Sequence, residues 1–181
     1  AGIAGGRGGM GLATGKLRSE EGGQLVWGDL EQGALEKAAA GLPGETLLVA
    51  ADMTRQEQVD QLVAKGEARF GKIDIVVHTA GVTGAKGDPL ELSDEDYQEA
   101  WETDFFSTVR VARATIPAMR SRNWGRFVGI TPENAVQPYW EAAVYNVAKA
   151  ALAAFITNLS YKEAAHGVLC NSDAPALIAP G

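Results

Sequence analysis

The sequence contains little cysteine and little histidine. Its one cysteine, Cys170, cannot form an internal disulfide, and a lone thiol makes no cysteine-based metal site. Val168 and Leu169 before it indicate a strand, so we expect Cys170 to be a small buried residue rather than a reactive thiol. The two histidines, His78 and His166, lie too far apart in the sequence to suggest a metal pair. We therefore predict no metal site.

Basic residues are also few. The 181-residue chain carries 16 Lys and Arg against 23 Asp and Glu, a formal net charge of -7. There is no basic cluster of the kind that nucleic-acid binding requires, and the acidic balance favours solubility. No apolar run approaches the roughly 18 residues that a membrane span needs, and no signal peptide is visible at the start. These absences predict a cytoplasmic protein without nucleic-acid or membrane partners, of a length that suits one domain.

Glycine is plentiful, with 22 residues, and it is densest at the start of the chain. Downstream, short apolar segments bounded by Gly, Asp or Asn alternate with longer amphipathic stretches, a pattern that predicts strands between helices. The five predicted strands cover residues 24–29, 46–52, 73–78, 126–130 and 168–171. We predict a single α/β domain with a doubly wound, Rossmann-like parallel sheet flanked by helices. The nearly continuous apolar strands indicate a sheet covered on both faces.

Capping signals place two of the helices. Thr54 with Glu57 forms a capping box after the second predicted strand. Ser93 with Asp96 forms another, which begins a longer amphipathic helix over residues 94–120.

A third helix, rich in alanine, spans roughly residues 140–165, and Gly167 is its expected C-cap.

The segment Ala4–Gly11 contains the pattern G-x-x-x-G-x-G at Gly5, Gly9 and Gly11. Small residues there let backbone amides approach a pyrophosphate closely while the chain turns from a strand into a helix. The helix N-terminus then offers unpaired N–H groups to the anion. A flexible glycine-rich terminus would match the same pattern, so the surrounding sequence has to decide.

Asp29 ends the next predicted strand, 18 residues beyond Gly11. An acid at about this distance meets the adenosine ribose hydroxyls in dinucleotide-binding folds. A carboxylate accepts bonds from a free 2′-OH and repels a 2′-phosphate, so we predict NAD(H) in preference to NADP(H). Arg7 is the one nearby cation that opposes this preference, and a solvated strand-end carboxylate is the alternative reading of Asp29. The predicted cofactor-binding residues in this part of the chain are Gly5, Arg7, Gly8, Gly9, Met10, Gly11, Asp29 and Leu30.

Four further segments follow in order among the predicted strands and helices: Asp52–Thr54, His78–Gly81, Tyr145–Lys149 and Pro175–Ile178. With this order and placement, the chain resembles the short-chain dehydrogenase/reductase family from Gly5 to Ile178. The resemblance implies that the strand-end acid of the first segment meets adenine and that the last segment lies beside the nicotinamide. The cofactor-binding residues that it adds are Asp52, Met53, Ala80, Gly81, Tyr145, Lys149, Pro175 and Ile178.

Tyr145 and Lys149 form the Y-x-x-x-K signature of that family. Residues four apart on a helix share one face. An isolated tyrosine has a pKa of about 10, and a nearby ammonium favours the phenolate, so we expect Lys149 to lower the pKa of Tyr145. The resemblance implies that Tyr145 exchanges a proton with the substrate oxygen and that Lys149 also holds the nicotinamide ribose. A surface Tyr–Lys pair on an amphipathic helix is the alternative.

Three positions depart from the family pattern. Pro132 stands where the family has a serine that holds the substrate oxygen, and the neighbouring Thr131 is expected to point to the opposite side of an extended chain. Asp104 stands where the family has an asparagine in a helix kink, and we expect its carboxylate to order a water. If the carboxylate is buried, it needs a charged partner or a raised pKa. Lys149 is the obvious partner. His78 replaces an amide, and we expect it to form a hydrogen bond in the core.

These features leave three hypotheses for function. The first is an NAD(H)-dependent alcohol dehydrogenase or carbonyl reductase acting on a small molecule, with Tyr145 as acid/base and Lys149 and Asp104 in the catalytic site. The second is a non-catalytic NAD(H)-binding homologue, which Pro132 and Asp104 motivate. The third is lyase or isomerase chemistry with Tyr145, for which the sequence offers no positive feature.

Two expectations concern assembly and the chain ends. Helices 94–120 and 140–165 carry more apolar positions than one sheet face would bury, and the resemblance implies a homodimer or homotetramer formed through them. Only Ala1–Ile3 precede the glycine turn, and the chain stops soon after the last predicted strand. We expect residues 1–181 to be one dinucleotide-binding, catalytic domain that lacks part of its first strand and a C-terminal helix and strand.

Overall fold

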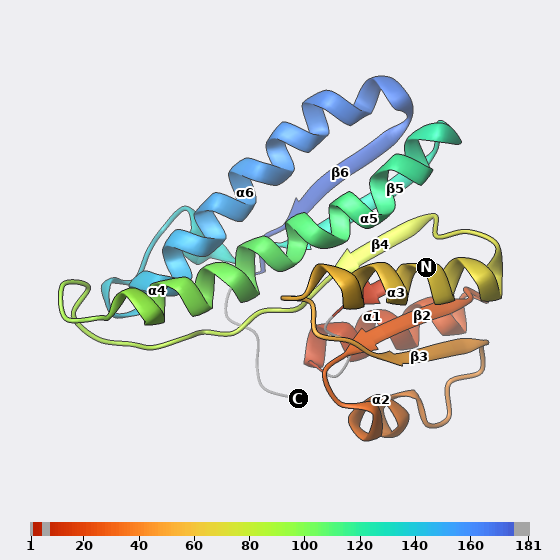
Figure 1. The fold of residues 1–181 in the computed structure, drawn as a ribbon, viewed down its shortest axis with the longest axis horizontal. Helices are drawn as coiled ribbons and strands as arrows, with labels where there is room; N and C mark the ends of the chain where they lie inside the picture. The colour runs from red at the N-terminus through yellow and green to blue at the C-terminus, as the bar shows by residue number, and fades with distance from the viewer. Residues whose placement is uncertain (1, 5–7, 176–181) are drawn as a thin grey trace.

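The computed structural model describes the backbone of residues 2–4 and the whole of residues 8–175. Within these residues the chain forms a six-stranded sheet in the order β3-β2-β1-β4-β5-β6, and every neighbouring pair is parallel (Figure 1). The strands are β1 (Gly2–Ala4), β2 (Leu25–Asp29), β3 (Thr46–Ala50), β4 (Ile75–His78), β5 (Gly125–Ile130) and β6 (Val168–Asp173). This order is that of a doubly wound dinucleotide-binding sheet, and the predicted fold class is confirmed.

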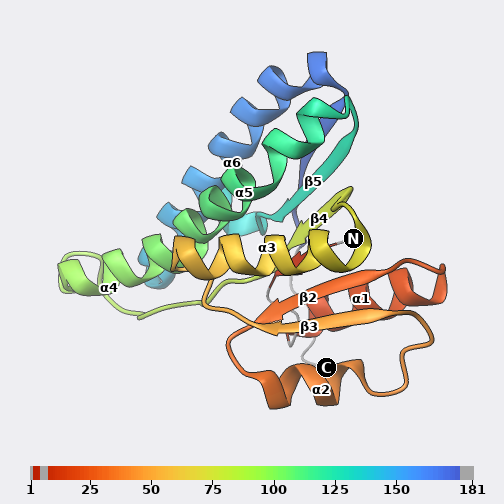
Figure 2. The same cartoon turned by 45° about the vertical axis from the view of Figure 1, so that its right-hand side comes forward.

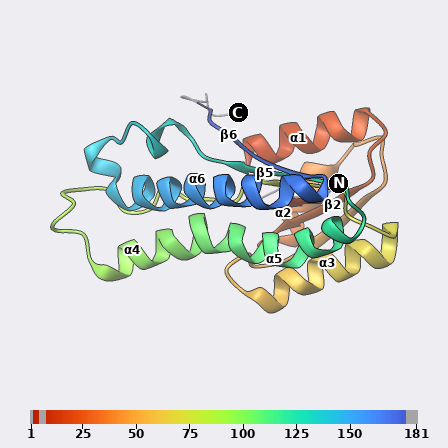
Figure 3. The same ribbon diagram turned by 90° about the horizontal axis from the view of Figure 1, so that it is seen from above.

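Helices connect the strands by crossovers. They are α1 (Gly9–Glu20), α2 (Gln32–Ala39), α3 (Gln56–Phe70), α4 (Asp94–Ala100), the π-helix η1 (Trp101–Phe106), α5 (Ser107–Ser121), the 3₁₀ turns η2 (Glu133–Ala135) and η3 (Trp140–Ala142), α6 (Ala143–Glu163) and the 3₁₀ turn η4 (Ala164–His166). Figure 3 shows α3, α5 and α6 on one side of the sheet and α1 on the other. Figure 2 shows α2 beside β3, while α4 projects past the sheet.

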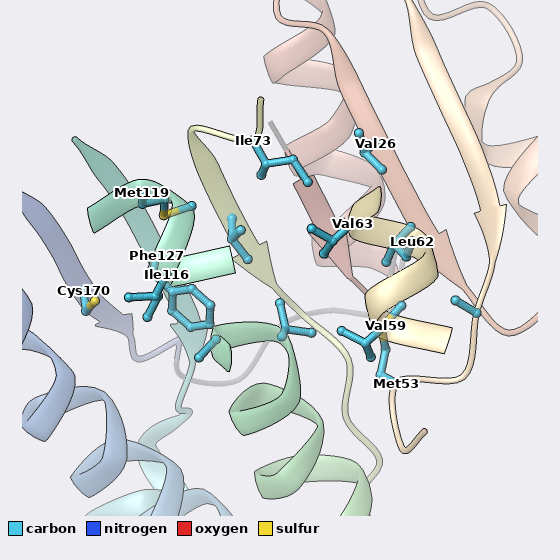
Figure 4. Packing of buried hydrophobic residues seen from close by; sticks show 14 of the residues in the cluster. Val26, Met53, Val59, Leu62, Val63, Ile73, Ile116, Met119, Phe127 and Cys170 are labelled. Atoms are coloured by element: carbon cyan, nitrogen blue, oxygen red, sulfur yellow. The ribbon is translucent and has the colours of Figure 1, made fainter. Parts of the chain in front are cut away.

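Two hydrophobic cores hold these layers together. The larger one lies between the sheet and the layer of α3, α5 and α6 (Figure 4), and it includes Val26, Met53, Val59, Leu62, Val63, Ile73, Ile116, Met119, Phe127 and Cys170. The smaller one packs Leu25, Trp27 and Leu35 together. Because side chains alternate along a strand, Leu25 and Trp27 point to one face of β2 and Val26 points to the other.

The expectation of a sheet covered on both faces holds for β2 but is wrong for β6. All five residues of β2 are buried. In β6, Val168 and Cys170 are buried whereas Leu169 and Asn171 are exposed. Within the described residues, β6 is therefore covered on the α6 side alone. Cys170 is a buried residue of a strand, as predicted.

One predicted capping box is present and the other is wrong. The Ser93 side chain accepts a hydrogen bond from the backbone N–H of Asp96, and the Asp96 carboxylate accepts one from the Ser93 backbone N–H. The helix α3 instead begins after an Arg55 N-cap that has no side-chain hydrogen bond. Thr54 donates both its backbone N–H and its hydroxyl to Asp52 Oδ1, at 2.8 and 2.7 Å, so it turns back to the strand end instead of capping the helix.

The helical stretch Trp140–His166 is the one stretch among the described residues that is long and apolar enough to cross a membrane by length and composition, with a mean hydropathy of 1.3. Lys149 lies inside this stretch, so it is a window of mixed composition and not the uninterrupted apolar run that the sequence was expected to lack. The helix packs against β6 and η1, and a core helix of a soluble protein meets the same criteria. Gly167 ends it in the left-handed region at φ 68°, which confirms the predicted C-cap.

Candidate functional site

A cleft of about 1040 Å³ opens at the carboxyl ends of the strands. It lies where the strand order reverses between β1 and β4, the usual ligand position in such sheets. Seven of the predicted cofactor-binding residues line it, namely Gly8, Asp29, Leu30, Asp52, Met53, Ala80 and Gly81. Several other lining residues were not among the predicted cofactor-binding residues, namely Thr79, Val82, Gln98, Glu99, Glu102, Thr103 and Ser107.

The predicted glycine turn leads into α1. Gly8 is the N-cap of this helix, and Gly9 opens its first turn, which contains no acidic residue. The first backbone N–H groups of the helix have no partner within it, so they remain available to an anion. A Cβ on Gly15 would lie 2.7 Å from the Trp27 ring, so this glycine lets α1 pack closely on β2. The predicted residues Gly5 and Arg7 lie outside the described residues.

The two acids at the strand ends are held in place differently. The Asp29 carboxylate is buried at the end of β2 and accepts the Leu30 backbone N–H at 2.7 Å. Oδ1 of Asp52 accepts both groups of Thr54, and the Asp52 backbone N–H donates to Gln58 Oε1 at 2.8 Å. Both carboxylates line the cleft at neighbouring strand ends, as predicted.

The π-helix η1 brings Asp104 into contact with Lys149 of α6. Lys149 Nζ lies 3.1 Å from Asp104 Oδ1, and the two side chains are only 4% and 0% exposed. The Val82 backbone N–H donates to the same Oδ1 at 3.2 Å, which ties the pair to the loop after β4. A Cβ on Gly81 would lie 2.5 Å from Asp104 Oδ1 and 3.0 Å from Lys149 Nζ, so only glycine fits beside the pair. The predicted partnership of Asp104 with Lys149 is confirmed.

Tyr145 lies next to this pair on α6. The distance from Lys149 Nζ to the centre of the Tyr145 ring is 5.5 Å. Burial, with the Asp104 charge as the second cause, raises the pKa of Tyr145 to about 12. Burial also raises the pKa of Asp104, against the opposing effects of Lys149 and the Val82 N–H. The expectation that Lys149 lowers the pKa of Tyr145 is therefore wrong, because the ammonium is paired with the Asp104 carboxylate.

His78 lies under the same region. Its Nε2 is 2.8 Å from Ser107 Oγ, and the ring is fully buried, which confirms the predicted hydrogen bond in the core. Burial, and secondly the positive charge of Lys149, lowers the pKa of His78 to about 3, so the ring is neutral at physiological pH.

The segment after β5 holds the position of the missing serine. Pro132 is the N-cap of η2, and the Thr131 side chain is buried. The Glu133 backbone N–H donates to the Pro175 carbonyl at 3.3 Å, so the predicted residue Pro175 lies beside this segment. Ile178 lies outside the described residues.

Polar contacts fix this segment against the start of α6. The Tyr139 hydroxyl donates to Glu133 Oε1 at 2.6 Å, and Asn146 Nδ2 donates to the Tyr139 carbonyl at 2.7 Å. Asn134 Nδ2 donates in turn to Asn146 Oδ1 at 3.0 Å. The sequence reasoning missed Asn146, which lies one residue after Tyr145 and is buried.

The arrangement fits an elongated anionic ligand with a ribose. The cleft runs from the helix N-terminus at Gly8 and the carboxylate of Asp29 to Gly81, which touches the Lys149 pair. Peptide N–H groups suit a pyrophosphate, and a carboxylate at the second strand end suits ribose hydroxyls. The residues present therefore fit a dinucleotide.

Comparisons with known proteins agree with this geometry. The sequence model described as short chain dehydrogenase matches residues 1–181. Dehydrogenase/reductase SDR family member 4 of Sus scrofa is 28% identical over 173 residues, which cover 94% of this chain. The chain spans 62% of the length of that relative.

Solved structures superpose closely on the fold. NAD⁺-bound xylitol dehydrogenase matches with a TM-score of 0.96 and 27% identity, over 99% of this chain and 70% of that one. L-sorbose reductase from Gluconobacter frateurii, complexed with NADPH and L-sorbose, matches with a TM-score of 0.92 and 32% identity, over 99% of this chain and 70% of that one.

Proposed function

The chain belongs to the short-chain dehydrogenase family, whose members are oxidoreductases that use a nicotinamide cofactor, and from this premise we propose that it interconverts a small alcohol and the corresponding carbonyl compound. The observation that carries the proposal is the placement of Tyr145 beside the buried Lys149, whose Nζ would lie 3.0 Å from a Cβ on Gly81 in the cleft wall. When bound, the nicotinamide supplies or accepts the hydride. Tyr145 exchanges the proton with the substrate oxygen.

We infer that the cofactor is NAD(H). Among the described residues lining the cleft, Arg55 is the one cation. The carboxylates that line it are Asp29, Asp52, Glu57, Glu99 and Glu102. A 2′-phosphate beside Asp29 would add negative charge to an acidic wall, whereas a free 2′-hydroxyl donates to that carboxylate. Because the family includes both NAD⁺-bound and NADPH-bound structures, the local charge is the argument that separates the two cofactors.

Each part of the cleft has a proposed role in holding this cofactor. The N–H groups at the start of α1 bind the pyrophosphate, and Asp29 accepts hydrogen bonds from the adenosine ribose. Lys149, held against Asp104, is the residue proposed to hold the nicotinamide ribose. Asp52 and Met53 flank the adenine end. These roles use the same residues that the sequence pattern selected.

We take polyols and ketoses as the first substrate class to test. The two solved relatives named above are a xylitol dehydrogenase and an L-sorbose reductase, so both names refer to compounds of this kind. This chain spans 62% of the length of the relative from Sus scrofa, and we propose the same activity for the whole protein.

The test has a binding stage and a turnover stage. Titration with NADH and with NADPH, followed by quenching of tryptophan fluorescence and energy transfer, is expected to give tighter binding of NADH. Turnover of a polyol and ketose panel, followed by NADH absorbance, is expected to fall about 10²–10⁴-fold in Tyr145→Phe. Tyr161→Phe is the matched control, since Tyr161 lies on the same helix but is 81% exposed. Turnover that survives Tyr145→Phe would reject this residue as the acid/base.

A non-catalytic NAD(H)-binding protein is the second candidate. The observation that favours it is Pro132, which offers neither a hydroxyl nor an N–H where the family has a serine. This candidate predicts tight NADH binding, no turnover across the panel, and activity created by Pro132→Ser. Rapid turnover by the wild type excludes it.

We further propose a cytoplasmic homodimer or homotetramer. Val147 and Tyr161 on α6 are exposed in the single chain, which supports association through this helix. Part of the surplus apolar face predicted from the sequence packs internally instead, since the rings of Phe105 on η1 and Phe155 on α6 meet edge to face at 5.9 Å. Light scattering after size-exclusion chromatography gives the number of subunits.

A further inference from the structure

The inference concerns the buried ion pair and rests on the proposed function. We propose that Asp104 is a positioning residue that keeps the Lys149 ammonium in a neutralising ion pair, so that Tyr145 stays a phenol at neutral pH and enters the reaction as a proton donor to a carbonyl substrate. The Tyr–Lys signature by itself does not say whether the tyrosine starts the reaction as a proton donor or as a proton acceptor. With Asp104 paired to Lys149, Tyr145 starts as the donor.

The geometry places Lys149 with the carboxylate rather than with the phenol. Lys149 Nζ is 3.1 Å from Asp104 Oδ1, and it also donates to the Ile130 carbonyl at 3.4 Å. The same nitrogen lies 5.5 Å from the centre of the Tyr145 ring. Both charged groups are almost completely buried, so water screens their attraction very little.

The backbone around the pair holds Asp104 in place. Asp104 lies within the π-helical turn between α4 and α5, and the extra residue in such a turn re-aims the side chains that follow it. The rings of Trp101 and Phe105 are in contact, at 4.8 Å between centres, and Phe105 meets Phe155 of α6. This aromatic packing fixes η1 on α6, so Asp104 and Lys149 are brought together by the fold and not by chance side-chain motion.

Other charged groups around the pair are already engaged. His78 on β4 is neutral, and Glu102 on η1 forms an ion pair with Arg110 of α5 at 2.5 Å. Glu133 on η2 accepts the Tyr139 hydroxyl. In the part of the chain that the structure describes, Asp104 is therefore the carboxylate that meets the Lys149 ammonium.

The electrostatic consequence falls on Tyr145. Burial and the Asp104 charge both raise the pKa of Tyr145, to about 12. In reduction, the Tyr145 O–H bond breaks and an O–H bond forms on the substrate oxygen, while the carbonyl carbon receives the hydride from the reduced nicotinamide. The tyrosinate then recovers a proton from water. The reverse reaction needs the phenolate at the start, so it is expected to require alkaline pH.

The first test is a spectroscopic titration that needs no substrate. The near-ultraviolet phenolate absorbance of the wild type minus that of Tyr145→Phe isolates this residue among the four tyrosines. At a pH of about 10, the ordinary tyrosine pKa, we expect Tyr145 to contribute no phenolate in the wild type. In Asp104→Asn, measured against Asp104→Asn/Tyr145→Phe, we expect the Tyr145 transition to move down by about 1–2 pH units.

Two controls assign the effect to the pair. Glu95→Gln removes an equal charge from an exposed site on α4 and is expected to leave the transition where it is. Asp104→Asn/Lys149→Met leaves no charge of the pair buried, so it is expected to fold even if the single variant does not. Its Tyr145 transition is expected at the same pH as in the wild type. Circular dichroism at each pH confirms that the fold is retained.

Three outcomes overturn the proposal. They are a wild-type Tyr145 that is already ionised at a pH of about 10, an Asp104→Asn variant with an unchanged transition, and a double variant that ionises at lower pH than the wild type. The pH profile of carbonyl reduction is the second readout: its alkaline limb is expected at lower pH in Asp104→Asn. A shifted titration without any turnover rejects the proposed function and leaves the ion-pair assignment standing.

Discussion

Ser107 Oγ accepts the Nε2–H of His78, and this contact selects the tautomer of a fully buried, neutral histidine. The serine hydroxyl has one proton, which it donates to the Thr103 carbonyl at 2.5 Å. It can therefore only accept from the imidazole, at 2.8 Å. Nδ1 of His78 is then the unprotonated nitrogen, and it is buried without a hydrogen-bond partner among the described residues.

This arrangement predicts a loss of stability at mildly acidic pH. The folded pKa of His78 is about 3, below its ordinary value of 6.5, so between these values the unfolded chain binds a proton that the folded chain does not. The free energy of unfolding must fall as the pH falls through that window. We expect the wild type to lose about 2 kcal/mol between pH 7 and pH 5 from this group, measured by urea denaturation.

The matched comparison uses the two histidines of the chain. His78→Asn is expected to remove most of this pH dependence, whereas His166→Asn, at an exposed site, is expected to keep it. Equal pH dependence in the wild type and in His78→Asn would mean that another group is responsible.

The sequence was sufficient for features that depend on local order. Asp29 and Asp52 each follow an apolar run, and because parallel strands end at the same edge, both acids were expected at the cleft, where the structure has them. The pairing of Asp104 with Lys149 was also predictable. A buried charge needs a partner, and the family pattern places the two near each other.

The sequence was insufficient where a nearby group competes for a side chain or where contacts link distant segments. The Thr54–Glu57 pattern matched a capping box, but the Asp52 carboxylate takes both donors of Thr54. The Val82 N–H that ties the loop to Asp104 depends on how η1 lies over the sheet, which no local pattern encodes.

The sign of the effect on Tyr145 was wrong for a related reason. Spacing places Lys149 one turn from Tyr145, which suggested activation by the ammonium. The effect also depends on what else the ammonium contacts, and Asp104 lies closer to it than the phenol ring does. The sequence shows only the spacing of Tyr145 and Lys149, whereas the pKa of Tyr145 in the fold depends on every charged group around the two side chains.

Replacing Asp29 is expected to change the choice of cofactor. The carboxylate is held by the Leu30 N–H at the cleft, so Asp29→Ser removes the acceptor for the ribose and the charge that opposes a 2′-phosphate. We expect the Kd for NADH to rise about tenfold or more and the Kd for NADPH to fall. Glu57→Gln, which removes an exposed carboxylate of the same cleft, is expected to change the ratio little. An unchanged ratio in Asp29→Ser would place specificity elsewhere.

Arg120 and Glu163 join the ends of α5 and α6. The guanidinium donates to both carboxylate oxygens, at 2.8 and 2.5 Å, and the Glu163 side chain is 1% exposed against 38% for Arg120. Arg120→Met leaves a buried carboxylate without its partner, so we expect it to lower the free energy of unfolding. Glu163→Gln removes the charge and keeps a hydrogen-bonding side chain, so its loss should be smaller, about 1 kcal/mol.

Urea denaturation of Arg120→Met and Glu163→Gln gives their free energies of unfolding and tests whether Arg120→Met is the less stable of the two. Arg18→Met, which removes one partner of the exposed Arg18–Glu21 pair on α1, is expected to cost well under about 1 kcal/mol. The pH dependence has a definite sign, because hydrogen bonding to Arg120 lowers the pKa of Glu163. The stabilisation is present above the ordinary glutamate pKa and is lost as the pH falls through the folded value. A Glu163→Gln variant less stable than Arg120→Met would contradict the assignment.

Cys170 is expected to resist thiol reagents until the protein unfolds. It is buried in β6, and burial, with the Glu163 charge as a second cause, raises the pKa of its thiol to about 11. At a pH of about 8 such a thiol is about a thousandth thiolate, and the thiolate is the nucleophile. A native protein mixed with a disulfide reagent should react at the rate of unfolding, and denaturant should accelerate the reaction.

The control is Leu169→Cys in a Cys170→Ala background, which moves the thiol by one residue to the exposed face of the same strand. The native Leu169 side chain is 43% exposed, so the shifted thiol should react rapidly. If the native Cys170 reacts as fast as this shifted thiol, β6 opens readily and its pairing with β5 is weaker than the fold implies.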